Sequence, residues 1–116
     1  MDRKTTSSNW ANEKALLETC PMTYTLSVID GRWKPVILFQ ISRGVRRFSE
    51  LEKAIPLISQ KMLTVRLKEL EKDQLRHREI FVEIPPRVEY YLTEKGRSLL
   101  PLLQEMNRWG KSNSNT

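Results

Sequence analysis

The sequence predicts an α+β fold, mainly α-helical, with one two-stranded β-hairpin toward the C-terminus. Through most of the chain, apolar residues recur every three or four positions, as they do on amphipathic helices. Residues 76–92 differ, because β-branched and aromatic residues there form two extended runs around Pro85-Pro86. The 116 residues, 39% of them apolar, suffice for one hydrophobic core and predict a single domain.

We divide the chain into a domain and two flanking segments. We expect residues 1–9 to form a disordered arm, residues 10–110 to form a single domain, and residues 111–116 to form a polar tail. The N-terminus lacks the apolar core of a signal peptide, and no apolar run is long enough to span a bilayer. We therefore expect a cytoplasmic protein that makes no membrane contact.

Three helices are expected in the first 44 residues. The first spans residues 10–18, and the second carries apolar residues at helical spacing up to Ile29. Gly31 should end the second helix, because glycine adopts the left-handed conformation at little cost. The third starts near Trp33 and ends at Gly44. Its expected buried face consists of Trp33, Ile37, Leu38 and Ile41.

Two further helices are separated by a short connection. Ser49 and Glu52 have the spacing of a capping box, and Ile55-Pro56 should end the helix that they begin. The next helix follows an N-cap at Ser59, and its apolar residues share one stripe. Two helices joined in this way form a helix-turn-helix. The stripe consists of Leu63, Leu67 and Leu70.

A hairpin and a last helix complete the fold. Residues 76–84 and 88–92 predict its two strands, and residues 46–48 before the helix-turn-helix predict a short strand or an extended segment. Thr93 should cap the last helix, which Pro101 should kink. Order is expected to end at Trp109-Gly110. This order of elements is that of a winged helix-turn-helix with a two-stranded wing.

The helix after Ser59 presents a polar, basic face opposite its leucines. Cations, amides and hydroxyls on such a face suit the major groove of DNA. Gln60 could read an adenine edge and Lys61 a guanine edge or a phosphate, whereas Val65 could touch a thymine methyl or be merely exposed. An ordinary solvated helix would show the same pattern. The net charge of +6 favours a polyanionic partner without identifying it.

Several segments in order resemble the HxlR-type family of bacterial transcription regulators, relatives of the MarR winged-helix proteins. Val45 and Gln74 depart from the family pattern, in which Pro and Gly are common at these positions. We therefore expect Gln74 to adopt a left-handed conformation, or the helix end to be reshaped. The matching segments are Cys20-Pro21, Gly31–Lys34, Gly44–Leu51, Ile58–Thr64, Leu67–Glu71, Pro85–Tyr90 and Leu92–Gly96.

The resemblance implies a homodimer that binds double-stranded DNA at a palindromic operator and regulates transcription, by default as a repressor. Arg46 and Arg47, which resemble the family's basic pair, would reach phosphates or remain solvated. Arg87 would enter the minor groove or touch phosphate. Arg76 and Arg78 would contact phosphate or solvate the strand edge, and we favour the edge for at least one. The candidate DNA-binding residues are Arg46, Arg47, Ser59, Gln60, Lys61, Thr64, Val65, Lys68 and Arg87.

The helices that flank the winged domain at its N- and C-terminal ends form the expected dimer interface, although a helix of this kind can also pack only on its own core. Cys20, the single cysteine, is either a small buried residue or a sensor of oxidants or electrophiles, as in the family's thiol-based sensors. Lys34 or a helix N-terminus would lower its pKa. The interface candidates are Leu16, Leu17, Leu99, Leu102, Leu103, Met106 and Trp109.

An enzyme is not expected. The only histidine, His77, stands between two arginines, and the sequence has no Gly-rich phosphate loop or zinc-ligand spacing, so we expect no catalytic residue, metal or cofactor. The alternative function is a winged-helix module that binds RNA or a protein partner without operator specificity. Against single-stranded RNA, the aromatic residues fall on predicted buried faces. These are Trp33, Phe39, Phe48 and Tyr90. A small-molecule effector remains unknown.

Overall fold

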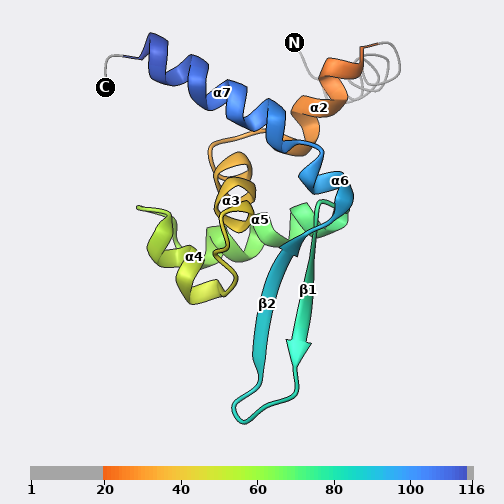
Figure 1. The fold of residues 1–116 in the computed structure, drawn as a ribbon, viewed down its shortest axis with the longest axis vertical. Coiled ribbons are helices and arrows are strands. Elements are labelled where there is room, and N and C mark those ends of the chain that lie inside the picture. Colours follow the sequence, from red (N-terminus) through yellow and green to blue (C-terminus); the bar gives the residue numbers. More distant parts are fainter. Residues whose placement is uncertain (1–19, 115–116) are drawn as a thin grey trace, which may run out of the picture. The chain divides into compact units, whose positions relative to one another are not determined.

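A computed structural model of the protein describes residues 20–114 (Figure 1). The chain divides into two compact units at the bond between Asp30 and Gly31. The described elements confirm the predicted class, which is mainly helical with a two-stranded antiparallel sheet. No helix within residues 20–114 combines the length and the apolar content needed to cross a membrane. The elements are α2 (Pro21–Ile29), α3 (Trp33–Ser42), α4 (Phe48–Ala54), α5 (Gln60–Lys72), β1 (Arg76–Phe81), β2 (Arg87–Leu92), α6 (Glu94–Arg97) and α7 (Leu100–Asn113).

The first unit contributes helix α2, which begins at Pro21. Proline suits this position, because the first amide of a helix has no intrahelical partner. The helix ends at Asp30, and Gly31 follows with a φ of +82°, as predicted. Its apolar residues Met22 and Leu26 are exposed, whereas Ile29 is buried. The helix predicted over residues 10–18 lies outside the described residues.

The core of the second unit surrounds α3, which contacts α4, α5, α7 and β2. Burial of a single aliphatic side chain contributes about 1.5–3 kcal/mol to the free energy of folding. The buried aliphatic residues of α3 therefore make a large contribution to the stability of this unit. Of the face predicted for α3, Trp33 is only half-buried, because it lies at the first turn. The other three, Ile37, Leu38 and Ile41, are fully buried, as are Leu51, Leu63, Leu70 and Leu75 from neighbouring segments.

Helix α4 begins earlier than the sequence predicted. The predicted capping pair of Ser49 and Glu52 is wrong, because the helix starts at Phe48 and its third residue is Glu50. The Glu50 carboxylate accepts hydrogen bonds from the backbone amides of Arg46 and Arg47, at 3.2 and 3.1 Å. The segment before α4 is extended, and the Arg46 carbonyl accepts a 2.7 Å hydrogen bond from the Tyr90 amide of β2.

Among the described residues, two that are not glycine adopt left-handed conformations, one at the end of the helix-turn-helix and one within its turn. Gln74 has a φ of +62°, as its departure from the family pattern predicted, and it allows the Leu75 amide to bond the Leu70 carbonyl at 2.9 Å. Leu57, with a φ of +72°, lies in the turn before α5 and was not anticipated. Its side chain is exposed, whereas the next residue, Ile58, is buried.

The wing is a regular antiparallel hairpin whose register runs from Arg76 opposite Leu92 to Phe81 opposite Arg87. Strand β1 ends at Phe81, three residues before the predicted end at Ile84. The residues between the strands form the wing loop, since Pro85 and Pro86 have no amide hydrogen for a sheet. Figure 1 shows the two strands running side by side to this loop.

The C-terminal helix predicted as one kinked element is two helices. Thr93 caps α6 by accepting a 3.0 Å hydrogen bond from the Gly96 amide, as predicted. Pro101 kinks nothing, because it lies in the first turn of α7, where its missing amide has no cost. Helix α7 continues to Asn113, three residues beyond the predicted end at Gly110.

Helix α6 lies against the chain that follows α5. A Cβ atom built on Gly96 would stand 2.1 Å from the carbonyl oxygen of Leu75. That oxygen also accepts a 3.1 Å hydrogen bond from the Thr93 amide, and the Thr93 hydroxyl donates to the Gln74 carbonyl at 2.6 Å. The Lys95 ammonium donates to the Asp73 carbonyl at 3.2 Å. Only glycine permits this approach without a shift of main chain.

Substituting Gly96 with Ala should lower the free energy of unfolding by about 1–3 kcal/mol, because the added methyl meets a main-chain oxygen. Urea denaturation followed by circular dichroism measures this change. Gly110→Ala is the matched control: Gly110 is also helical, and nothing lies within 4 Å of an added Cβ. That control should be neutral or stabilise by up to about 1 kcal/mol. Equal stability of both variants would contradict the assigned packing.

Candidate nucleic-acid interface

The outer face of α5 is the surface that the sequence predicted to contact DNA, and its side chains are exposed. Leu63, Leu67 and Leu70 are at most 2% exposed, so they fix the orientation of the helix about its axis. Val65, on the opposite face, is 40% exposed. The residues that the sequence placed on this face are all exposed: Ser59, Gln60, Lys61, Thr64, Val65 and Lys68.

Hydrogen bonds within α5 determine what its two hydroxyls can offer a ligand. The Ser59 oxygen accepts a 3.0 Å hydrogen bond from the Met62 amide, as the predicted N-cap, and its own proton remains available for donation. The Thr64 hydroxyl donates to the Gln60 carbonyl at 2.8 Å, so toward a ligand it acts as an acceptor. The N-terminal end of α5 therefore presents donors beside Lys61, in a position where the helix dipole favours anions.

Arg46 is held inside the domain. One terminal nitrogen of its guanidinium donates to the carbonyls of Ile41 and Tyr90, at 3.0 and 3.3 Å. The guanidinium carbon lies 4.4 Å from the centre of the Tyr91 ring. We therefore correct the sequence-based assignment: the side chain of Arg46 joins α3 to β2 and is not directed to phosphate. Arg47 is exposed.

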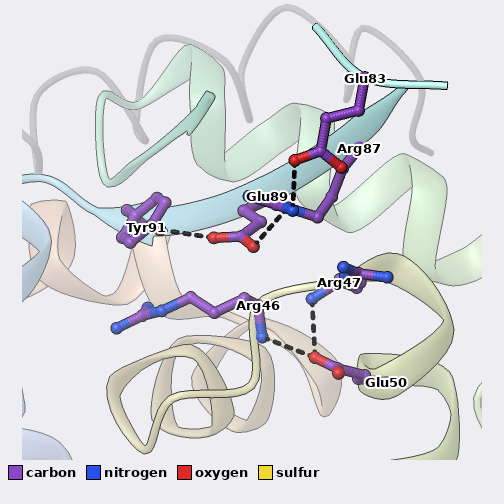
Figure 2. Close-up of polar contacts among 7 residues, drawn as sticks. All are labelled: Arg46, Arg47, Glu50, Glu83, Arg87, Glu89 and Tyr91. Atoms are coloured by element: carbon purple, nitrogen blue, oxygen red, sulfur yellow. Dashed lines mark hydrogen bonds and ion pairs between the residues drawn. The ribbon is translucent and has the colours of Figure 1, made fainter. Parts of the chain in front are cut away.

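Arg87 is paired with two carboxylates at the start of β2 (Figure 2). A terminal nitrogen donates to Glu83 at 2.7 Å. Its Nε lies 2.9 Å from a Glu89 oxygen, an ion pair with a geometry too bent for a hydrogen bond. The guanidinium carbon also lies 4.1 Å from the centre of the Phe81 ring. The sequence placed Arg87 near the wing tip but gave no sign of these partners.

Arg76 is buried. It therefore neither solvates the strand edge nor is placed to contact phosphate, the two roles that the sequence suggested. Its Nε donates to the Leu67 carbonyl of α5 at 2.8 Å, and a terminal nitrogen pairs with Glu71 at 3.4 Å. Burial lowers the pKa of Arg76, and the Glu71 carboxylate opposes that change. The guanidinium lies 5.0 Å from the Tyr90 ring, so Arg76 connects α5 to both strands of the wing. Arg78 is exposed, as expected of a strand edge.

The aromatic residues predicted to be buried are half-buried. None of the four aromatic side chains is fully buried, because each lies where a helix or strand begins or at the edge of the hydrophobic core. Their rings serve partly as platforms for arginines of the same domain: Arg32 lies 5.5 Å from the ring of Trp33 and Arg43 5.8 Å from that of Phe39. The four residues are Trp33, Phe39, Phe48 and Tyr90.

Cys20 occupies the N-cap position of α2 and is partly exposed, so it is not the buried residue of the simpler interpretation. Hydrogen bonding by the Thr23 side chain, and next by the Thr23 backbone amide, lowers the pKa of the Cys20 thiol. Partial burial opposes this change, and the Met22 amide adds a smaller lowering. The two backbone amides belong to the helix N-terminus, one of the causes that the sequence suggested.

Helix α7 leaves much of its apolar stripe uncovered. Leu103 is buried, whereas Leu102, Met106 and Trp109 are 40%, 44% and 70% exposed. A groove of about 340 Å³ between α3 and α7 adds to this apolar surface. The candidates Leu16 and Leu17 lie outside the described residues. The groove is lined by Pro35, Val36, Phe39, Leu103, Met106 and Asn107.

Comparison with known proteins gives consistent matches. The family described as HxlR-like helix-turn-helix matches residues 28–116. The protein YybR of Bacillus subtilis, named as an HTH-type transcriptional regulator, is 47% identical over 96 residues, which cover 83% of this chain and 77% of YybR.

Two solved structures are similar along most of their length. The redox regulator HypR in its oxidised form has a TM-score of 0.79 and 45% identity, covering 84% of this chain and 100% of that one. The reduced form of the regulator YodB from B. subtilis has a TM-score of 0.71 and 40% identity, covering 83% of this chain and 95% of that one.

Replacing Thr23 with Val should raise the pKa of the Cys20 thiol toward its ordinary value, because the hydroxyl that stabilises the thiolate is lost. A raised pKa moves the titration midpoint to higher pH and slows alkylation at neutral pH. The thiolate absorbance, followed against pH, measures it. Thr25→Val is the matched control, since the Thr25 hydroxyl donates to the Pro21 carbonyl. An unchanged midpoint in Thr23→Val would contradict this assignment.

Proposed function

Because the chain belongs to the HxlR-like helix-turn-helix family, we propose that it binds double-stranded DNA in a sequence-specific manner, as a homodimer that represses transcription. It is a transcriptional regulator and not an enzyme. The observation that carries the proposal is the orientation of α5, with its leucines buried and its polar, basic side exposed. Since a bacterial operator lies in the nucleoid, we expect the protein to act there, in the cytoplasm.

In this mechanism the N-terminal end of α5 leads into the major groove. Gln60 reads an adenine edge, and Lys61 a guanine edge or a phosphate. The Ser59 hydroxyl donates to a phosphate while its oxygen retains the cap, and the half-exposed Val65 is available to a thymine methyl. Thr64 and Lys68 complete the contacts along the same face.

Phosphate contacts outside α5 come from the wing and from the segment before α4. Arg47 is exposed and suited to this role, whereas Arg46 is committed to the carbonyls of Ile41 and Tyr90 and leaves the proposed contact set. Arg87 contacts the duplex from the wing, whose loop prolines limit the ordering cost on binding. Such contacts fix register without reading sequence.

A homodimer would cover the apolar surface of α7 and present two copies of α5 to a palindromic operator. Met106 and Trp109 are the strongest interface candidates, because they are the large apolar side chains left most exposed on this helix. Leu99 and Leu102 extend the same surface, with Leu103 buried beneath it. The N-terminal candidates Leu16 and Leu17 would contribute from the preceding segment.

We also propose that Cys20 senses oxidants or electrophiles. Its partial exposure and lowered pKa favour a reactive thiolate, and the similar protein HypR is named a redox regulator. With one cysteine in the chain, a disulfide joins Cys20 to the partner's copy or to a small thiol. Diamide takes up the two electrons and two protons that the two thiols release. A changed dimer geometry would then separate the recognition helices and release DNA.

Duplex DNA from the controlled promoter should outcompete both unrelated duplex and RNA for the purified protein at physiological salt. Selection of bound fragments from a genomic library supplies that promoter and should yield a palindromic consensus. Equal competition by every polyanion would instead favour the alternative, a winged-helix module for RNA or protein without operator specificity.

Lys61→Ala should weaken binding to the selected operator by about 1–3 kcal/mol, because it removes a contact to a base edge or phosphate. Fluorescence anisotropy measures the change in affinity, and circular dichroism confirms that the fold is kept. Lys111→Ala, which removes the same charge from exposed helix α7, is the matched control and should have little effect. An unchanged affinity for Lys61→Ala would remove Lys61 from the contact set.

Diamide or quinone treatment should abolish operator binding by the wild type, while Cys20→Ser should continue to bind. Electrophoretic mobility shift measures both proteins side by side, and a reductant should restore binding to the diamide-treated wild type. If both proteins lose binding to the same extent, the sensor role of Cys20 is wrong, whereas the DNA-binding role stands.

A further inference from the structure

The guanidinium of Arg87 is shared between two carboxylates that differ in exposure. Glu89 is on β2 itself, its side chain is only 18% exposed, and it also accepts a 2.6 Å hydrogen bond from the Tyr91 hydroxyl. That hydroxyl, followed by the charges of Arg87 and Arg47, lowers the pKa of Glu89. Glu89 is therefore a fixed, charged partner of Arg87.

Glu83 is the exchangeable partner. It lies in the wing loop rather than in a strand, and its side chain is 47% exposed. It accepts its 2.7 Å hydrogen bond from a terminal nitrogen of Arg87, on the part of the guanidinium that a phosphate would engage. Figure 2 shows Glu83 and Glu89 approaching the Arg87 guanidinium from different sides. An exposed pair of this kind contributes about 0.2–1 kcal/mol, so it is easily exchanged.

The charges of the wing support this distinction. Residues 76–92 contain three arginines and three glutamates, so the wing as a whole has no excess positive charge. The acids are Glu79, Glu83 and Glu89. Of the arginines, Arg76 is buried beneath α5 and Arg87 is paired with two of these acids. Arg78 is exposed, whereas attraction of phosphate to Arg87 itself requires that Arg87 lose a carboxylate.

We propose that Glu83 is an internal competitor of DNA phosphate for Arg87, holding in the free protein the place that a phosphate oxygen takes in the complex. The inference rests on the proposed binding of duplex DNA. Glu89 and the Phe81 ring keep the guanidinium in position while the exchange occurs. Glu83 thus weakens the sequence-independent part of binding and leaves base recognition by α5 unchanged.

Glu83→Gln should bind a random-sequence duplex about two- to fivefold more tightly than the wild type, as expected for removal of one exposed ion pair. Fluorescence anisotropy at low salt measures the affinity. The matched control is Glu105→Gln, which removes the same charge from an exposed pair with Arg108 on α7. Arg87→Ala should weaken binding, and Glu83→Gln should give no gain when combined with it.

A gain by Glu83→Gln no larger than that of Glu105→Gln, or one that persists with Arg87→Ala, would overturn the inference while duplex binding itself stands. Failure of the wild type to bind any duplex would overturn the proposed function as well. A second measurement does not require DNA: pyrophosphate should shift the Arg87 Nε–Hε resonance at a lower concentration in Glu83→Gln than in the wild type. Identical titrations would also overturn the proposal.

Discussion

The burial of three leucines against α3 determines which side of α5 the protein presents. Leu63, Leu67 and Leu70 occupy one stripe, and rotation of the helix about its axis would bring Lys61 or Lys68 into the core at a large cost in desolvation. The polar face is thus exposed as a consequence of core packing, and it requires no ligand to hold it outward. The other parts of the interface are positioned relative to this helix.

Two arginines that resemble surface charges in the sequence position the wing. Arg76 links the middle of α5 to the wing strands, and Arg46 links the end of α3 to β2. Each guanidinium donates to at least one main-chain carbonyl oxygen and lies over a tyrosine ring, so both side chains are engaged in contacts within the domain. By contrast, Arg47 and the basic side chains on the outer face of α5, Lys61 and Lys68, are exposed.

Local signals predicted most of the fold, and tertiary contacts account for what they missed. The leucine stripe and the caps at Ser59 and Thr93 are properties of neighbouring residues, so the sequence contained them, whereas the left-handed Gln74 was expected from the family pattern. The burial of Arg76 depends on the Leu67 carbonyl, nine positions away, and that of Arg46 on Tyr90. No periodicity of the sequence distinguishes such arginines from those that bind phosphate.

The close approach of Gly96 to Leu75 has a mechanical consequence. Leu75 follows directly on the end of the recognition helix, and α6 precedes α7, which carries the exposed apolar stripe. Main chain here abuts main chain, with no flexible side chain between them to absorb a displacement. A displacement of α7 would therefore be transmitted through α6 to the C-terminal end of α5, because the main-chain contact between them is rigid.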